Sequence, residues 1–298
     1  MLKNQDSLSE LLRSLKLRAE VYVHADFCGH WAVDTSGQRR IPFHMLGSGQ
    51  GWLHIEGCEP RLLRAGDLVL FPHDVKHLVS SEPQPDAETR LNDPGSESDG
   101  PATNLLCGFF DFDNLGSSPL LDGLPQVIVL ELGEQGRHPN IRTLIQLMVA
   151  ELELSEPGSY AVVNQLCYLL FIQVLRLQIA KGLETGLLAA LFDRRISRAL
   201  DAIHTRPEAQ WSLMTLAQAA AMGRTSFAER FHQLVGQTPM KYLTLWRMQR
   251  ARELLLTTER SMLDIAEACG YQSEVAFRKA YRSLMGEPPG QTRRQGEG

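Results

Sequence analysis

A short sequence pattern occurs twice in the last third of the chain and limits what this part can fold into. The first copy consists of Leu216-Ala217, Met222-Gly223, Phe227, Phe231, Gly236 and Pro239, and the second of Ile265-Ala266, Gly270-Tyr271, Phe277, Tyr281, Gly286 and Pro289. The last three matching pairs are each 50 residues apart. A solenoid needs about three or more repeats to bury a continuous core, so two copies predict two equivalent small units instead.

Each unit has the pattern of a helix-turn-helix. We expect helices over 215–221 and 224–234 around a turn at 222–223, and helices over 262–269 and 273–284 around a turn at 270–271. Ala217 is small enough for a helix crossing, and Gly223 permits a tight turn. A long helix over 240–256 should join the two units, and another over 189–204 should precede them.

Charge is distributed unevenly along the chain. Residues 1–188 carry 14 Lys/Arg and 24 Asp/Glu, a net charge of −10, whereas residues 189–298 carry 16 and 11, a net charge of +5. Such asymmetry predicts a nucleic-acid-binding part attached to an acidic part.

Cysteine usage and hydropathy indicate the compartment. The five cysteines are widely scattered and form no CxxC motif, which favours a reducing cytoplasm over a disulfide framework. The N-terminus has no secretory apolar core, and no run approaches 18 uninterrupted apolar residues. We therefore expect a cytoplasmic protein that spans no membrane.

The region from residue 21 to about 128 has a β texture. Short apolar runs at 21–23, 31–33, 41–46, 51–55, 61–63, 68–71, 105–112 and 127–130 are separated by turn residues. This spacing predicts a β-sandwich or small barrel. Residues 80–104 are nearly devoid of large apolar groups and are rich in Pro, Ser, Asp and Glu, so they are expected to form a mobile loop.

Helical periodicity resumes after residue 139 with two helices, the second at about 160–181. This second helix is apolar nearly all round, so two surfaces must cover it. Either it is buried within one chain, or the β domain covers one side and the same helix of a second subunit the other. The expected fold is α+β and multidomain: a barrel with dimerisation helices at 1–181, a linker at 182–188, and an all-α domain at 189–298.

The stretches LAQAAAMGRTSFAERFHQLVGQTPMKYL and RMQRARELLLTTERSMLDIAEACGYQSEVAFRKAYRSLMGEPPGQTR resemble the C-terminal domain of AraC/XylS-type transcription regulators. The resemblance covers roughly 190–294. It implies that two recognition helices enter successive major grooves of promoter DNA, about 34 Å apart. It also implies RNA polymerase as a partner and favours an activator.

By position, a set of residues becomes candidate DNA contacts. Those near base edges or phosphates are Arg224, Thr225, Ser226 and Arg230 in the first unit and Gln272, Ser273, Glu274 and Arg278 in the second. Lys241, Arg247, Arg250 and Lys279 are predicted to contact phosphates, which add affinity without sequence information. The family often has Arg two residues after the position of Phe227, where this chain has Glu229.

Residues 42–79 resemble a cupin barrel of the kind that precedes the DNA-binding domain in AraC-type regulators. Gly66-Asp67, Pro72 and His77 match the second cupin motif, and His44 falls near a ligand position of the first, although the usual His-x-His followed by Glu is absent. A set of Cys28, His44, His77 and Cys107 would suit Zn²⁺, unless these are inert core residues. The expected effector pocket is lined by Tyr22, Trp31, Phe43, His44, Trp52 and His77, which serve equally well as plain barrel core.

These observations predict a sequence-specific DNA-binding regulator that works without catalysis, as a homodimer controlled by a small effector in the barrel. One alternative is a cupin metalloenzyme with an accessory DNA-binding tail. Another is a ligand-independent DNA-binding protein whose barrel is solid core and serves only dimerisation.

Overall fold

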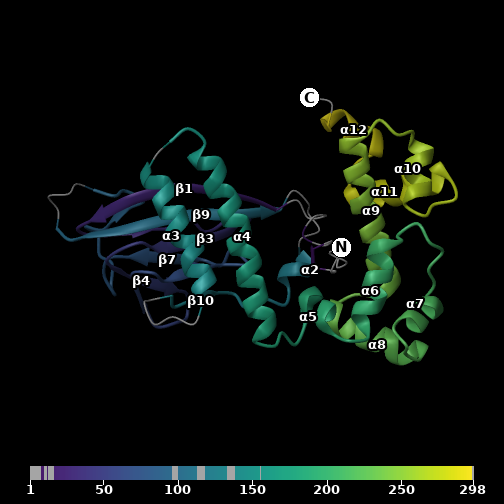
Figure 1. Cartoon of the computed structure of the whole chain (residues 1–298), viewed down its shortest axis with the longest axis horizontal. Helices are drawn as coiled ribbons and strands as arrows, with labels where there is room; N and C mark the ends of the chain where they lie inside the picture. Colours follow the sequence, from purple (N-terminus) through teal and green to yellow (C-terminus); the bar gives the residue numbers. More distant parts are fainter. Residues whose placement is uncertain are drawn as a thin grey trace. The chain divides into compact units, whose positions relative to one another are not determined.

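The computed structural model describes residues 8–9, 12, 17–95, 100–112, 118–132, 138–154 and 156–296. The chain divides into two compact units (Figure 1). We call Leu17–Asp113 with Leu124–Ala180 the sheet unit. We call Met1–Lys16, Asn114–Gly123 and Lys181–Gly298 the helical unit.

The sheet unit contains two five-stranded sheets. The first has the order β1-β9-β3-β6-β10 and the second β5-β4-β7-β2-β8. The strands are β1 Leu17–Cys28, β2 Trp31–Val33, β3 Ile41–Leu46, β4 Gln50–Ile55, β5 Arg61–Arg64, β6 Leu68–Leu70, β7 His77–Ser80, β8 Arg90–Leu91, β9 Ala102–Phe112 and β10 Ile128–Leu130. Side chains from both sheets, such as Val69 and Cys107 from the first and Leu53 and Val79 from the second, share one buried core.

The predicted β domain is confirmed, with two differences in its strands. β7 pairs antiparallel with both β2 and β4 although its short apolar run is absent from the expected set of strands. The segment expected as a mobile loop contains β8, which pairs parallel with β2. Backbone pairing explains β8, since the Arg90 N–H donates to the His30 carbonyl and Asn92 N–H to the Ala32 carbonyl.

Two helices, α3 Pro139–Leu154 and α4 Ser159–Ala180, cover the outer face of the first sheet (Figure 1). Phe171 on α4 packs against Phe110 and Phe112 of β9, with ring centroids 4.8 and 5.8 Å apart. By length and composition α4 could cross a membrane, a property that core helices of globular proteins share, and here one of its faces packs on the sheet. Val162 and Leu169 stay 44% and 46% exposed, so α4 is not covered all round within the described chain.

The helical unit contains α2 Ser118–Leu121, α5 Gly186–Phe192, α6 Ile196–Thr205, α7 Leu213–Ala219, α8 Arg224–Val235, α9 Pro239–Thr257, α10 Met262–Ala268, α11 Glu274–Met285 and α12 Pro289–Gly296. α7 and α8 form the first helix-turn-helix and α10 and α11 the second, with α9 between them. The repeated aromatic residues form the cores: the tilted rings of Phe227 and Phe231 lie 5.7 Å apart, as do those of Phe277 and Tyr281, and all four are fully buried.

Two segments near the expected domain boundary differ from the sequence prediction. The sequence places residues 118–123 in the N-terminal domain, whereas the structure packs them on α5, where a Cβ on Gly123 would lie 2.1 Å from the Thr185 carbonyl oxygen. The expected linker at 182–188 also contains the first turn of α5, because Leu187 and Leu188 are buried in the helical unit.

Glycines of the repeat end the recognition helices. Gly236 and Gly286 have φ of 73° and 78° and form the C-caps of α8 and α11, a conformation that favours glycine. The turn residues differ from expectation, because Gly223 has an ordinary φ of −67° and caps the start of α8. The left-handed residue of the first turn is Ala221, with φ of 53°, and its counterpart in the second turn is Gly270, with φ of 77°.

Candidate functional site

The first recognition helix, α8, buries one side and presents the other. Phe227 and Phe231 face the core. Arg224, Thr225 and Ser226 lie exposed at its first turn, as the sequence predicts for a surface that meets DNA. Backbone N–H groups are also unpaired at such a helix N-terminus, which favours phosphate contacts.

Arg230 is engaged within the helical unit. Its Nε and Nη2 both donate to Oδ2 of Asp193, at 3.1 and 3.0 Å. Oδ1 of Asp193 accepts from the N–H groups of Arg195 and Ile196 at the start of α6. Burial alone would raise the pKa of Asp193, but the hydrogen bonds from these three residues outweigh it and lower that pKa. The predicted DNA contact at Arg230 is therefore tied to α6 instead.

Arg247 is likewise engaged, in the middle of α9. Its Nε donates to the Pro207 carbonyl at 2.7 Å and its Nη2 to the Ala209 carbonyl at 2.8 Å. Its guanidinium carbon lies 5.9 Å from the ring centroid of Tyr271, beside the turn at Gly270. Arg247 thus joins the segment before the first helix-turn-helix to the turn of the second. The predicted phosphate contact is in the structure an internal link.

The second recognition helix, α11, carries three of the predicted contacts, Glu274, Arg278 and Lys279, and two more precede it. Gln272 is exposed before the helix, and the Ser273 hydroxyl caps it by accepting from the Ala276 N–H. Nη2 of Arg278 lies 2.6 Å from Oε1 of Glu274, one turn earlier on the same face. An exposed pair of this kind contributes little to stability, so Arg278 can exchange Glu274 for DNA at small cost. Lys279 on α11 and Lys241 on α9 are exposed.

Sequence reasoning missed Val275 and Arg282 on α11. Val275 is 79% exposed at the second position of the helix, where an apolar β-branched side chain has no core to fill. Apolar contact with a thymine methyl group is a recognised mode of base readout in the major groove. The signal was present in the helical spacing, since residues 275, 278, 279 and 282 fall on one face.

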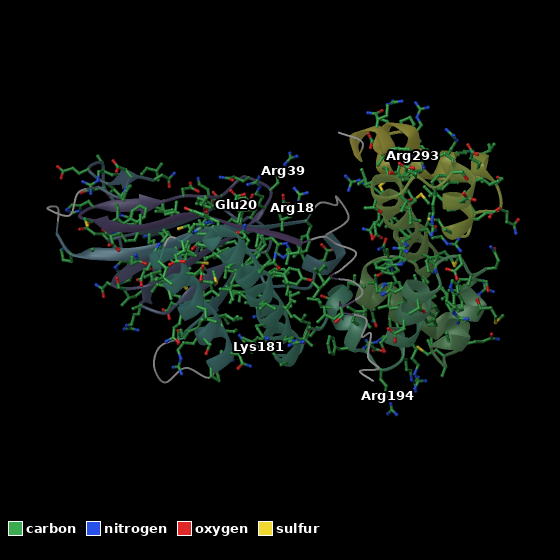
Figure 2. The ribbon with its side chains drawn as sticks, turned by 45° about the horizontal axis from the view of Figure 1, so that its top comes forward. Arg18, Glu20, Arg39, Lys181, Arg194 and Arg293 are labelled. Carbon is green, nitrogen blue, oxygen red and sulfur yellow. The ribbon has the colours of Figure 1, made fainter. Side chains whose placement is uncertain are left out.

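The two recognition surfaces are chemically unequal. The exposed side of α11 carries three cations, Arg278, Lys279 and Arg282. The corresponding side of α8 carries Glu229, His232 and Gln233, while Arg230 is paired with Asp193. Another basic side chain, Arg194, is exposed on the helical unit, whereas Arg293 donates to the Arg260 carbonyl (Figure 2).

A polar cluster lies inside the sheet unit. Nε2 of His44 is 3.0 Å from Nε2 of His77, and Oγ1 of Thr35 lies within 3.2 Å of both. Nδ1 of His44 is 3.1 Å from Sγ of Cys107, and Nδ1 of His77 donates to the Val75 carbonyl at 2.7 Å. Burial and the nearby His77 lower the pKa of His44 to about 3, and burial also lowers the pKa of His77. Both imidazoles are therefore neutral at physiological pH.

The four residues predicted to hold zinc do not converge. Cys28 pairs with Ala102 on β9, five residues from Cys107, a separation of about 17 Å along a strand. Cys107 meets His44 at Nδ1, the side of the ring away from His77. Burial raises the pKa of the Cys107 thiol to about 12, which disfavours the thiolate that zinc requires. Among the described residues no group of three or more His, Cys, Asp or Glu could hold a metal ion.

The residues predicted to line an effector pocket occupy different places. Trp31 is part of the core between the sheets, and His44 and His77 belong to the polar cluster. Phe43 lies on the opposite face of β3 from His44 and packs against Phe110, so it faces the helices. Trp52 alternates with the core residue Leu53 and faces outward. Alternation along each strand thus removes Phe43 and Trp52 from the barrel interior.

Tyr22 lies at an irregularity in β1, where the pairing register with β9 shifts between Val21 and Val23. Its ring stacks on Phe109 with centroids 5.9 Å apart. Burial and the nearby Cys107 raise the pKa of Tyr22, while a hydrogen bond with Thr35 acts in the opposite direction. Tyr22 therefore connects the exposed rim of the barrel with the buried polar cluster.

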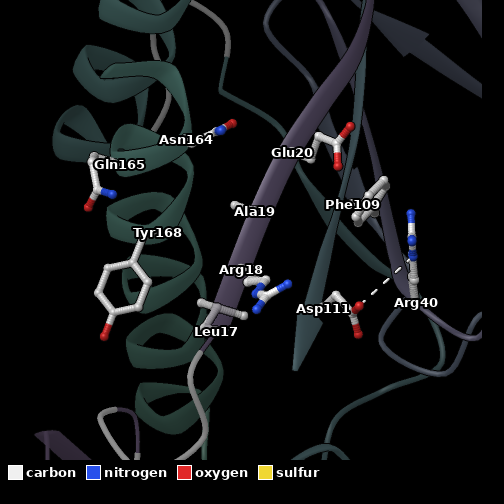
Figure 3. A pocket seen from close by; sticks show the side chains of 10 residues that line it. All are labelled: Leu17, Arg18, Ala19, Glu20, Arg40, Phe109, Asp111, Asn164, Gln165 and Tyr168. Carbon is white, nitrogen blue, oxygen red and sulfur yellow. Dashed lines mark ion pairs between the residues drawn. The ribbon is translucent and has the colours of Figure 1, made fainter. Parts of the chain in front are cut away.

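The rim also borders a pocket of about 550 Å³ within the sheet unit (Figure 3). Its lining residues are Leu17, Arg18, Ala19, Glu20, Arg40, Phe109, Asp111, Asn164, Gln165 and Tyr168. The Arg40 guanidinium lies 3.8 Å from the centroid of the Phe109 ring, and its Nε is 4.0 Å from Oδ2 of Asp111.

Two recognition helices on one connecting helix, together with a double-sheet barrel, define a DNA-binding regulator with a cupin-type domain. Residues 6–180 match the family model described as cupin, and residues 216–295 match a helix-turn-helix domain. The chain is 30% identical to an uncharacterised HTH-type transcriptional regulator of Haemophilus influenzae, over 97% of this chain and 98% of that one. It is 29% identical to a putative AraC-like transcription regulator of Streptomyces lividans, over 97% and 98%.

A third relative is the RCS-specific HTH-type transcriptional activator RclR of Escherichia coli, 28% identical over 85% of this chain and 84% of that one. The chain belongs to the AraC family of transcription regulators with an N-terminal cupin domain.

Proposed function

We propose that α8 and α11 read promoter DNA in two successive major grooves, with α9 setting the distance between them. The observation that carries this proposal is the link through Arg247, which joins the two helix-turn-helix units into one body. The proposed contacts are Arg224, Thr225, Ser226, Gln272, Val275, Arg278, Lys279, Arg282 and Lys241. We leave out Arg230, Arg247 and Arg250, which have partners within the chain, as well as Ser273, which caps α11, and Glu274, which pairs with Arg278.

We further infer that a small effector binds at the open end of the barrel, near Tyr22, Thr35 and the histidine pair. The support is that a chain of polar groups runs from the exposed rim to the buried cluster. Because both imidazoles are neutral, the expected effector is an uncharged molecule that donates and accepts hydrogen bonds. It would shift the population of regulator conformations by binding one of them more tightly.

A homodimer is the expected assembly, with α4 as a contact surface. Val162 and Leu169 leave apolar area exposed on a helix that is otherwise packed on the sheet.

We place the protein in the cytoplasm, with RNA polymerase as a partner. The name of the E. coli relative supports an activator. The incomplete first cupin motif supports a regulator over a cupin metalloenzyme.

Genome-wide mapping of bound sites tests the proposal, followed by footprinting of the purified protein on the strongest site. Protection of two major-groove segments about one helical turn apart is expected. Protection of a single segment, unchanged when α8 is altered at Thr225 and Ser226, would show that only α11 reads DNA. Measurement of transcription with and without an effector found by screening then shows whether the protein activates or represses its promoter.

A further inference from the structure

One edge of the first sheet is open. β1 stands at the end of the strand order and pairs only with β9 in the described part of the chain. Every second residue of an edge strand directs its N–H and C=O groups away from its neighbour, which makes the edge a template for another strand.

The pocket at the barrel rim runs along this edge. Four consecutive residues of β1, Leu17 to Glu20, line it. Because successive side chains of a strand point to opposite faces, only a space along the edge can touch all four. Figure 3 shows the same arrangement, with α4 on one side of β1 and Phe109, Asp111 and Arg40 on the other.

The sides of this space are polar. Asn164 and Gln165 of α4 line one side, and the Oδ1 atom of Asn164 is buried with no hydrogen-bond partner among the described residues. Arg40 and Asp111 line the other side as a loose pair 4.0 Å apart. An extended segment added to the edge would bring backbone donors into this space, in the manner of β-augmentation.

We propose that the occupant is β1 of a second copy of this chain, paired antiparallel about a two-fold axis at Ala19. The argument is charge complementarity. Arg18 and Glu20 lie on one face of β1, and a two-fold axis at Ala19 places Arg18 opposite the partner's Glu20 and Glu20 opposite the partner's Arg18. An axis at Arg18 or at Glu20 would instead place like charges opposite each other.

The edge pairing specifies how the proposed homodimer is built, and it rests on that proposal. An antiparallel pair joins the first sheets of two copies into one continuous sheet. Because α4 covers the outer face of that sheet, the two copies of α4 lie on the same face. The edge pairing is therefore compatible with contacts between the helices, and experiments on β1 and on α4 separate the two.

Charge exchange tests the register directly in the full-length protein. Arg18→Glu and Glu20→Arg should each weaken dimerisation roughly tenfold, measured by analytical ultracentrifugation, because each places like charges opposite one another. The double variant Arg18→Glu/Glu20→Arg should restore it. An equimolar mixture of the two single variants should form a heterodimer. As a matched control, exchange of Arg61 and Glu131, an exposed ion pair of the sheet unit that does not involve β1 or β9, alters charge to the same extent and should leave dimerisation unchanged.

Cross-linking tests the position of the axis. Ala19→Cys in a Cys58→Ser background should form a disulfide between subunits on mild oxidation, since residues directly opposite in an antiparallel pair have Cα atoms about 4.5–5.5 Å apart. Glu20→Cys in the same background should not, because Glu20 faces the partner's Arg18.

The outcomes separate the edge pairing from the dimer itself. A dimer that Leu169→Glu disrupts, but that survives both single charge variants and gives no Ala19→Cys cross-link, overturns the edge pairing and leaves the α4 contact standing. A chain that stays monomeric at every concentration overturns both. A small molecule that protects residues 17–20 from hydrogen exchange in a monomer assigns the pocket to a ligand and overturns the edge pairing.

Discussion

Arg230 and Asp193 form an ion pair in which two guanidinium nitrogens share one carboxylate oxygen, at 3.1 and 3.0 Å. The pair fastens the recognition helix α8 to the start of α6, where Asp193 also caps the helix. Arg230, which the sequence places among the candidate DNA contacts, thus holds α8 against the start of α6.

Arg230→Ala should leave base preference unchanged. The Arg230 side chain is 47% exposed, and Asp193, which is 18% exposed, keeps its two backbone N–H partners, so the loss of stability should be about 1 kcal/mol. Competition binding with a randomised operator library measures the preference, and a denaturant titration measures the stability. A change of preferred base within the first half of the operator would return Arg230 to the DNA-contacting set.

Arg278→Ala should weaken operator binding by about 1–3 kcal/mol if the side chain reads a base, and the loss should be confined to one base pair. Fluorescence anisotropy on the operator and on single-base variants measures this. Glu274→Gln is the control, because it frees Arg278 from its partner without removing it. Uniform weakening on all sequences would identify a phosphate contact.

Arg247→Ala should weaken binding to the full operator, in which α8 and α11 each enter a major groove, more than binding to a shorter DNA fragment that only one of the two helices can enter. The substitution removes hydrogen bonds to the Pro207 and Ala209 carbonyls, so the two units lose their fixed relative placement. Loss of hydrogen bonds from a charged group also costs about 1.5–3 kcal/mol of stability. Equal weakening on both fragments would point to a direct phosphate contact.

Ala221→Gly should stabilise the helical unit by about 0.5–1 kcal/mol, since Ala221 holds a left-handed conformation with φ of 53°. Gly270→Ala should destabilise the unit by more than Ala221→Gly stabilises it. The backbone at Gly270 is left-handed, and the Cβ atom added by the substitution would lie 2.5 Å from Nη2 of Arg247. Thermal unfolding of the two variants gives opposite shifts. Shifts of the same sign would mean that the two turns are not equivalent.

Acid should destabilise the sheet unit. The folded-state pKa of His44 is about 3, below the ordinary value of 6.5, so the unfolded chain binds the proton more readily. The contribution of His44 is therefore full above pH 6.5 and falls as the pH drops toward 3, by about 2 kcal/mol at pH 5. Thermal unfolding of the full chain between pH 7 and 5 measures the loss, which His44→Gln should reduce. A melting temperature independent of pH would contradict neutral burial.

The periodicity of apolar residues in the sequence predicted most of the fold. Features that depend on partners distant in the sequence could not be predicted in this way. The alternation of apolar residues located most strands, and the 50-residue repeat located both helix-turn-helix units. β8 was not predicted because Arg90–Leu91 is held by backbone hydrogen bonds to β2, and such bonds do not depend on the local composition. Two of the predicted DNA contacts have intramolecular partners for which the same holds. The partners of Arg230 and Arg247 lie 37 and about 40 residues away in the sequence, so the neighbouring residues do not indicate these contacts.

The unequal recognition surfaces have a consequence for the promoter. The first surface presents Arg224 and Glu229, and the second presents Arg278, Lys279 and Arg282 beside Glu274. Because the two surfaces differ, the protein turns with its site when the site is turned end for end. Each bound subunit therefore has a polarity on the DNA, and the two half-sites of an operator differ in sequence and in salt dependence. Inverting an operator in front of its gene should place the sheet unit on the other side of the site and change the transcriptional output.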